Sequence, residues 1–298
     1  MRRMAAVLST AAMFVAISVP IASATPGEGV YLSLGTSLAA GSQADSAGNT
    51  TFSSDRSYTD QLHQRLKGRL AGELTHVKLG CPGETTDQFL GGVDKDGDPS
   101  NCAALYATGS QIGDALATIE GGDVILVTID VGANDLFDAL ELCGNDAACL
   151  NAQIQSVAAK AAQIVLELRG SGYTGPIVAM NYYNPLAAAA IGYINGVAGQ
   201  QSPNLEFALL SDVLVSGLNG ALAQAYGSLA VPVANVYGAF NAGDFGDDSP
   251  SNETPDNVDV LCKLSYMCPG GETVKANIHL NRHGYRVVAK AFLDYIDW

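Results

Sequence analysis

The chain has 298 residues, 48% of them hydrophobic, and a formal net charge of −15 at pH 7. This length fits one large domain or two small ones, and the apolar content is ample for a packed core. A strongly acidic surface repels phosphate backbones at long range, so we expect no nucleic-acid partner.

The first 24 residues have the pattern of a secretory signal peptide. Arg2 and Arg3 precede an apolar run from Ala5 to Ile21, which ends in the small residues Ala22-Ser23-Ala24. Ser and Pro interrupt the run, so it suits a cleaved segment better than a permanent span. We expect a secreted or periplasmic mature chain of residues 25–298, no stable membrane span, and no later apolar run long enough to cross a bilayer.

Six cysteines in an exported chain predict disulfides. Short loops favour the pairs Cys143–Cys149 and Cys262–Cys268, which leaves Cys81–Cys102 as the third pair. A zinc site is the rival interpretation, but no C-x-x-C pair occurs and the histidines are distant in sequence. We therefore expect three disulfides and no metal.

Strand and helix patterns alternate along the mature chain. Val30–Leu34 is typical of a buried strand, and a helix with one apolar face opens at 57–60. Asp123–Val131 is almost continuously apolar, as in a central parallel strand covered on both faces. Further strands are predicted at 74–79, 176–181 and 231–236, and further helices at 111–119, 147–169, 205–226 and 282–295. This alternation, without an internal repeat or a linker, predicts one α/β domain with a mostly parallel sheet.

In such a sheet, function gathers just beyond the carboxyl ends of the strands. The first strand stops at Gly35 and is followed by Thr36 and Ser37. A serine presented there is a candidate nucleophile, although a lone Gly-x-Ser at a strand end is more often an ordinary turn. The hypothesis that Ser37 is a nucleophile therefore depends on partners at other strand ends.

An activated serine needs a base and donors for the developing oxyanion. Of the four histidines, His279 lies in a predicted polar loop before the last helix and is favoured over His283, which suits a capping or surface role. The other two belong to a surface helix and a short strand and are expected to be structural. Gly83 and Asn134 follow two other strands, where oxyanion donors are wanted, although each alone is also typical of a turn.

These blocks resemble those of the SGNH or GDSL-type esterases and lipases. The family's Gly-Asp-Ser-(Leu/Tyr) block corresponds to Gly35-Thr36-Ser37-Leu38, and its second-block glycine to Gly83. Its Gly-x-Asn-Asp block is matched in full by Gly132-Ala133-Asn134-Asp135. Its Asp-x-x-His block corresponds to Ala276-Asn277-Ile278-His279, with Gly284 following. The four blocks occur in order across nearly the whole mature chain.

The resemblance implies a three-layer α/β/α sandwich with a central, mostly parallel five-stranded sheet, the flavodoxin-like fold of that family. It also implies Ser37 as nucleophile and His279 as base, with the Ser37 N–H, the Gly83 N–H and the Asn134 amide as the oxyanion hole. No metal or cofactor is implied.

Two positions depart from the family pattern. Thr36 replaces the aspartate beside the nucleophile, which we interpret as a retuned turn. Ala276 stands where the acid of the triad belongs, an acid that normally fixes the histidine tautomer. Some family members use a Ser-His dyad assisted by a main-chain carbonyl, so we predict that the Ala276 carbonyl orients His279. A displaced acid, Glu272 or Asp259, is the competing hypothesis.

The sequence therefore predicts a secreted serine ester hydrolase, an esterase or lipase. We expect a small-molecule or lipid ester as substrate and a monomeric protein. The apolar segment Leu186–Val197 is predicted to be a lid, an acyl-binding wall or an ordinary buried loop. A polysaccharide deacetylase on the same scaffold and a catalytically silent binding protein are the alternatives.

Overall fold

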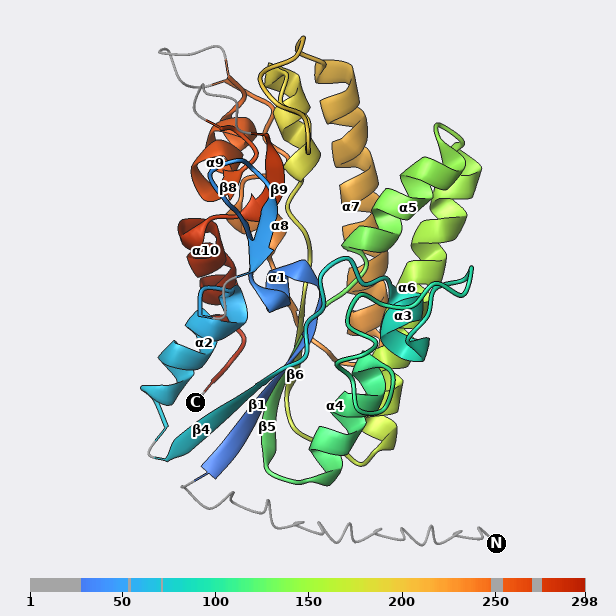
Figure 1. Cartoon of the computed structure of the whole chain (residues 1–298), viewed down its shortest axis with the longest axis vertical. Helices are drawn as coiled ribbons and strands as arrows, with labels where there is room; N and C mark the ends of the chain where they lie inside the picture. The colour runs from blue at the N-terminus through green and yellow to red at the C-terminus, as the bar shows by residue number, and fades with distance from the viewer. Residues whose placement is uncertain (1–27, 53–54, 71, 248–253, 270–274, 298) are drawn as a thin grey trace, which may run out of the picture.

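The computed structural model describes residues 28–52, 55–70, 72–247, 254–269 and 275–297. The predicted signal peptide lies outside these residues. A central sheet lies between two groups of helices, with α2 and α10 on one side and α4, α5, α6 and α7 on the other (Figure 1). The protein is therefore a three-layer α/β/α sandwich, as predicted.

The five strands of the central sheet are all parallel, in the order β4-β1-β5-β6-β7. Their bounds are β1 Glu28–Gly35, β4 Glu73–Lys78, β5 Val124–Asp130, β6 Ile177–Met180 and β7 Val233–Ala234. The chain runs from β1 outward to β4 and then returns past β1 to β5. The strand order thus reverses between β1 and β5, the place where open α/β sheets bind their ligands.

Apolar residues recur at helical spacing along the helices, so each helix has an apolar side that packs against the sheet. The helices thereby cover both faces of the sheet. Ser57 forms a capping box with Asp60 at the start of α2, and the ring of Tyr58 on that helix stacks at 4.9 Å on Phe292 of α10. Their bounds are α2 Tyr58–Lys67, α4 Gln111–Glu120, α5 Ala133–Cys143, α6 Ala147–Gly170, α7 Leu205–Gly227 and α10 Arg282–Leu293. The shorter helices are α1 Ser37–Ala40, α3 Thr86–Gly91, α8 Val236–Ala239 and α9 Asp256–Leu264.

Two segments differ from the sequence predictions, and a third, at 186–197, takes one of the two forms that its sequence allows, a loop or a short helix. The polar loop after β1 contains an antiparallel hairpin, β2 Ser42–Ala44 and β3 Thr50–Phe52. The segment predicted as a loop around His279 is a strand, β9 Asn277–Leu280, because it pairs with β8 Ser265–Tyr266. The apolar segment at 186–197 begins with a 3₁₀ helix, η1 Pro185–Ile191, packed against α7 and α9.

The structure contains the three predicted disulfides, Cys81–Cys102, Cys143–Cys149 and Cys262–Cys268. The last two each close a loop with a sequence separation of 6. The Cys262–Cys268 loop contains β8, the strand that pairs with β9. This disulfide therefore closes the segment against which the strand that carries His279 is hydrogen-bonded.

Helix α7 corrects one expectation from the sequence. With a mean hydropathy of 1.4 in its most apolar stretch, it is long and apolar enough to cross a membrane by composition. In the fold it packs against α6 and η1, and 39% of that stretch is buried. The same composition is met in a core helix of a globular domain.

Candidate active site

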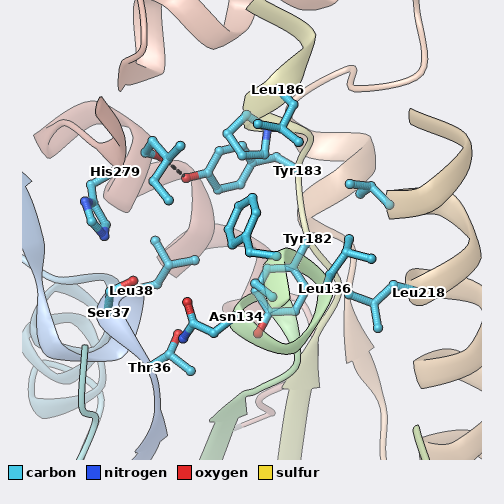
Figure 2. A pocket seen from close by; sticks show the side chains of 15 residues that line it. Thr36, Ser37, Leu38, Asn134, Leu136, Tyr182, Tyr183, Leu186, Leu218 and His279 are labelled. Atoms are coloured by element: carbon cyan, nitrogen blue, oxygen red, sulfur yellow. Dashed lines mark hydrogen bonds between the residues drawn. The ribbon is translucent and has the colours of Figure 1, made fainter. Parts of the chain in front are cut away.

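One cavity opens at the carboxyl end of β1 and β5. It encloses about 620 Å³, including the part open to solvent, and Ser37, Asn134 and His279 contribute polar groups to it. Figure 2 shows these three side chains projecting into the same space, with the imidazole of His279 on the side of Ser37. The apolar wall is formed by Leu38, Leu136, Phe137, Tyr182, Tyr183, Pro185, Leu186, Val215, Leu218 and Ile278.

Ser37 stands at the first position of α1, directly beyond the end of β1. The turn needs glycine at position 35, because φ is +144° there and a Cβ would lie 2.5 Å from the carboxyl carbon of Asp130. As the first residue of α1, Ser37 has a backbone N–H without an intrahelical acceptor. The side chain is half-buried, so it borders both the core and the cavity.

A carboxyl group from the next strand holds this turn in place. The Thr36 backbone N–H and Oγ1 both donate to Asp130 Oδ1, at 2.7 and 2.9 Å, and the Tyr58 hydroxyl donates to Asp130 Oδ2 at 2.8 Å. Burial raises the pKa of Asp130 to about 7, while the bonds from Thr36 and Tyr58 act in the opposite direction. Asp130 was not predicted from the sequence, although a carboxyl group near the end of an apolar strand was a signal for it.

A second buried network holds the other side of the turn. Gln111 accepts a hydrogen bond from the Gly35 N–H at 2.6 Å and donates to the Gly35 carbonyl at 2.9 Å. It also donates to the buried carboxyl group of Glu84, which accepts from Ser100 and Tyr106. Burial raises the pKa of Glu84 to about 7. The turn that carries Ser37 is thus bound to the segment that follows Gly83.

Asn134 is the second residue of α5, and the same Glu84 segment fixes its side chain. Its Nδ2 donates to the Glu84 carbonyl at 2.8 Å, which leaves the second amide hydrogen free for a ligand. Gly83 is exposed, has φ of +78° and does not line the cavity. The structure therefore brings Ser37, Asn134 and His279 together at one cavity and leaves Gly83 outside its lining.

Asn277 holds His279 through its side-chain oxygen. Nδ1 of His279 lies 2.7 Å from Asn277 Oδ1, which also accepts the His279 backbone N–H at 3.0 Å. Asn277 Nδ2 donates to the Gly48 carbonyl at 3.2 Å. A backbone N–H only donates and a carbonyl only accepts, so these two partners fix the orientation of the amide. The Nδ1 atom of His279 must therefore carry the proton, which leaves Nε2 as an unprotonated base.

The prediction that the Ala276 carbonyl orients His279 is wrong. That carbonyl accepts the Gly196 N–H at 2.7 Å, and the position at Nδ1 belongs to Asn277. Asn277 and His279 lie two residues apart on β9 and so share a face, which lets the Asn277 side chain reach the imidazole. Ala276 precedes β9, and its carbonyl oxygen is bound to the Gly196 N–H instead.

The remaining candidates lie elsewhere. Asp259 is on α9 and is not the group at Nδ1, and Glu272 lies outside the described residues. His283 is an exposed residue in the first turn of α10 and does not line the cavity. Burial lowers the pKa of His279 to about 4, so its imidazole is neutral at physiological pH.

A second serine–histidine pair lies in the interior. Ser33 Oγ is 2.9 Å from His76 Nε2, and the carboxylate of Asp60 is 3.7 Å from His76 Nδ1. Ser33 is 0% exposed, in the middle of β1, and His76 stacks on Tyr31 at 4.7 Å. No substrate carbonyl reaches such a hydroxyl, so this pair is structural. Among the described residues, no group of three or more His, Cys, Asp or Glu is arranged to hold a metal ion.

Residues 33–287 match the model of the GDSL-like Lipase/Acylhydrolase family. The chain belongs to this family. The protein is accordingly a hydrolase of carboxylic esters. No match was found among curated protein sequences.

Solved structures share the same fold at low sequence identity. A lipase from a goat rumen metagenome has 16% identity and a TM-score of 0.54, over 89% of this chain and 96% of the other. An extracellular lipase from Streptomyces rimosus has 16% identity and a TM-score of 0.53, over 89% and 99%. A putative GDSL-like lipase from Parabacteroides merdae has 13% identity and a TM-score of 0.52, over 90% and 95%.

Proposed function

We propose that this protein is a secreted serine ester hydrolase in which Ser37 forms an acyl-enzyme and His279 is the base. The observation that carries the proposal is the contact between His279 Nδ1 and Asn277 Oδ1, from which the tautomer of His279 follows. Asn277 holds the Nδ1 proton, so the lone pair of Nε2 is available on the side of the cavity that Ser37 lines. A neutral imidazole beside a half-buried serine is what nucleophilic catalysis requires.

The reaction follows from these positions. Ser37 Oγ attacks the ester carbonyl carbon while Nε2 of His279 takes the hydroxyl proton. The resulting imidazolium gives this proton to the departing alkoxide, which leaves as an alcohol. Water then attacks the acyl-enzyme with His279 again as base, and the carboxylic acid is released from Ser37.

Asn277 orients His279 as the acid of a triad would, but its amide carries no charge. Its oxygen selects the tautomer and fixes the ring, whereas a neutral amide stabilises the imidazolium less than a carboxylate does. We therefore propose a Ser-His-Asn arrangement in place of a dyad completed by a main-chain carbonyl.

The Ser37 N–H and the free amide hydrogen of Asn134 are our proposed oxyanion donors, and Gly83, outside the cavity lining, is not among them. Each contributes about 3 to 4 kcal/mol if it acts like other oxyanion donors. Asn134 is held rigid through Glu84, as a preorganised donor must be.

The apolar wall favours an ester with an apolar acyl group. Leucine, tyrosine and valine side chains surround the cavity, and Leu186 of η1 belongs to that wall. This supports the acyl-site interpretation of the segment at 186–197. A polysaccharide deacetylase would place only an acetyl group in this cavity and would need polar groups for the sugar, so we keep it as the second candidate.

Three disulfides support export to an oxidising compartment.

Hydrolysis of p-nitrophenyl acetate, butyrate and octanoate by the mature chain, with Ser37→Ala as control, tests the proposal. We expect turnover that depends on Ser37 and a kcat/KM that rises from acetate to a longer chain. Turnover that survives in Ser37→Ala would contradict the mechanism. A clear preference for acetate would favour the deacetylase.

A further inference from the structure

The turn that carries Ser37 uses an unusual source for its carboxyl group. The family pattern has aspartate directly before the serine, whereas this chain has Thr36 there. The structure brings the carboxylate of Asp130 to Thr36 from the neighbouring strand, because the sheet register pairs Gly35 with Asp130. Thr36 and Asp130 are thus joined by hydrogen bonds across the two neighbouring strands.

We propose that Asp130 is the positioning residue of the nucleophile, supplying from β5 the carboxylate that the family motif carries beside the serine. This inference rests on the proposed role of Ser37. Asp130 does not line the cavity and touches no substrate, so it acts through Thr36.

The hydrogen bonds of Thr36 support a positioning role. Thr36 is the residue before α1, where a threonine hydroxyl commonly caps the helix, yet its side chain makes no capping bond. Its hydroxyl and its backbone N–H are both directed to the same oxygen of Asp130. The peptide that leads into Ser37 is therefore fixed by two bonds to a buried carboxyl group.

The surroundings make this contact specific to the two residues. Asp130 is 0% exposed and Thr36 is 3% exposed, so no water replaces a lost partner without rearrangement. Gly35 leaves room for the carboxyl group, since a Cβ there would collide with it. Tyr58 donates to the other oxygen and fixes the plane of the carboxyl group. Removal of Asp130 leaves the Thr36 N–H without an acceptor next to the reacting serine.

Exchange of the two residues tests the proposal. The variants are Asp130→Ser, Thr36→Asp and the double variant with both changes, compared by kcat, KM and thermal unfolding midpoint. Asp130→Ser removes the carboxyl group that accepts from Thr36. We expect kcat to fall about 100-fold with a small change in KM, because the reacting serine is displaced from its position. Thr36→Asp places two carboxyl groups in one buried site and should also be impaired. The double variant returns one carboxyl group to the turn and should recover about tenfold or more of the lost kcat.

Asp114 offers a matched control. Its Oδ1 accepts both the N–H and the hydroxyl of Thr108, at 2.8 Å each, but this pair lies away from the cavity. Asp114→Ser should lower the unfolding midpoint and leave kcat within about threefold of the wild type.

The proposal is overturned if Asp130→Ser keeps the wild-type kcat, or if the double variant is no more active than Thr36→Asp. The second comparison applies even where Asp130→Ser does not fold. These outcomes are distinct from failure of the proposed function, which appears in the wild type as turnover independent of Ser37.

Discussion

Two serine–histidine pairs can be compared in the part of the chain that the structure describes: Ser37 and His279 border a cavity, whereas Ser33 and His76 lie in the interior. Ser33 and His76 lie 2.9 Å apart with an aspartate on the far side of the imidazole, a sequence of groups like that of a catalytic triad. Ser37 and His279 have an asparagine in that place. Judged by residue types alone, the buried pair is the better triad.

Position relative to the end of β1 separates the two pairs. Ser33 is inside the strand, covered on both faces, whereas Ser37 is four residues further and past the end of the sheet. Burial lowers the pKa of both histidines to about 4, so both are neutral. We therefore attribute the proposed difference in function to access to substrate and to the proposed oxyanion donors, which lie only beside Ser37 and His279.

Replacement of each histidine in turn should give the largest contrast. His279→Ala removes the base, and we expect kcat to fall by about 10⁴-fold or more, as when a triad member is lost. His76→Ala should leave kcat within about threefold while lowering the unfolding free energy by roughly 1–3 kcal/mol, because Ser33 loses its buried partner. Steady-state kinetics and denaturant unfolding measure both. A large loss of kcat in a folded His76→Ala protein would contradict the separation of the two pairs.

Changes at Asn277 test the group that orients the base. Asn277→Ala should lower kcat by about 100-fold, since the imidazole loses its tautomer control. Asn277→Asp restores an acceptor with a charge and should exceed Asn277→Ala in kcat. A carboxylate also favours the imidazolium, so the acid limb of its pH profile should move to higher pH. Equal kcat in Asn277→Ala and the wild type would show that another group orients His279.

Filling the cavity should affect long acyl chains selectively. Leu136 forms part of the wall, and Leu136→Trp reduces the space while Ser37 and His279 themselves stay unchanged. We expect kcat/KM for the octanoate ester to fall about tenfold or more, because the loss of one or more methylene contacts in an apolar pocket has an effect of this size. The kcat/KM for the acetate ester should change by less than about threefold. The acetate ester is the internal control. A parallel loss for both esters would place the acyl chain outside this cavity.

The pH dependence provides the finest test of the environment of His279. Its pKa is lowered to about 4 by burial, so the imidazole stays unprotonated, and therefore active, until the pH falls through that value. The acid limb of kcat/KM should lie near pH 4 and not near the usual histidine value of about 6.5. A limb near pH 6.5 would mean that the imidazole is solvated in the free enzyme.

Much of the candidate site was predictable because Ser37 and Asn134 follow strand ends and His279 shortly precedes the last helix. Ser37, Asn134 and His279 each belong to a short motif, and the order of the motifs along the chain identified the fold. Local spacing also predicted the disulfides correctly, since the two short loops leave one remaining pair.

The missed residues depend on pairing between segments that the sequence does not reveal. Asp130 meets Thr36 only through the register of β1 with β5. Asn277 orients His279 because residues 277–280 form a strand, whereas a loop was predicted there. In a strand the spacing of two residues between Asn277 and His279 indicates a shared face, and that signal was available once the strand was known.

Covalent labelling tests the central claim most directly. The mature protein is treated with a fluorophosphonate ester, which phosphonylates activated serines, and the labelled peptide is identified by mass spectrometry. We predict a single adduct on Ser37, formed far more slowly in His279→Ala and at the wild-type rate in His76→Ala. An adduct on Ser33, or labelling of Ser37 that does not depend on His279, would contradict the account.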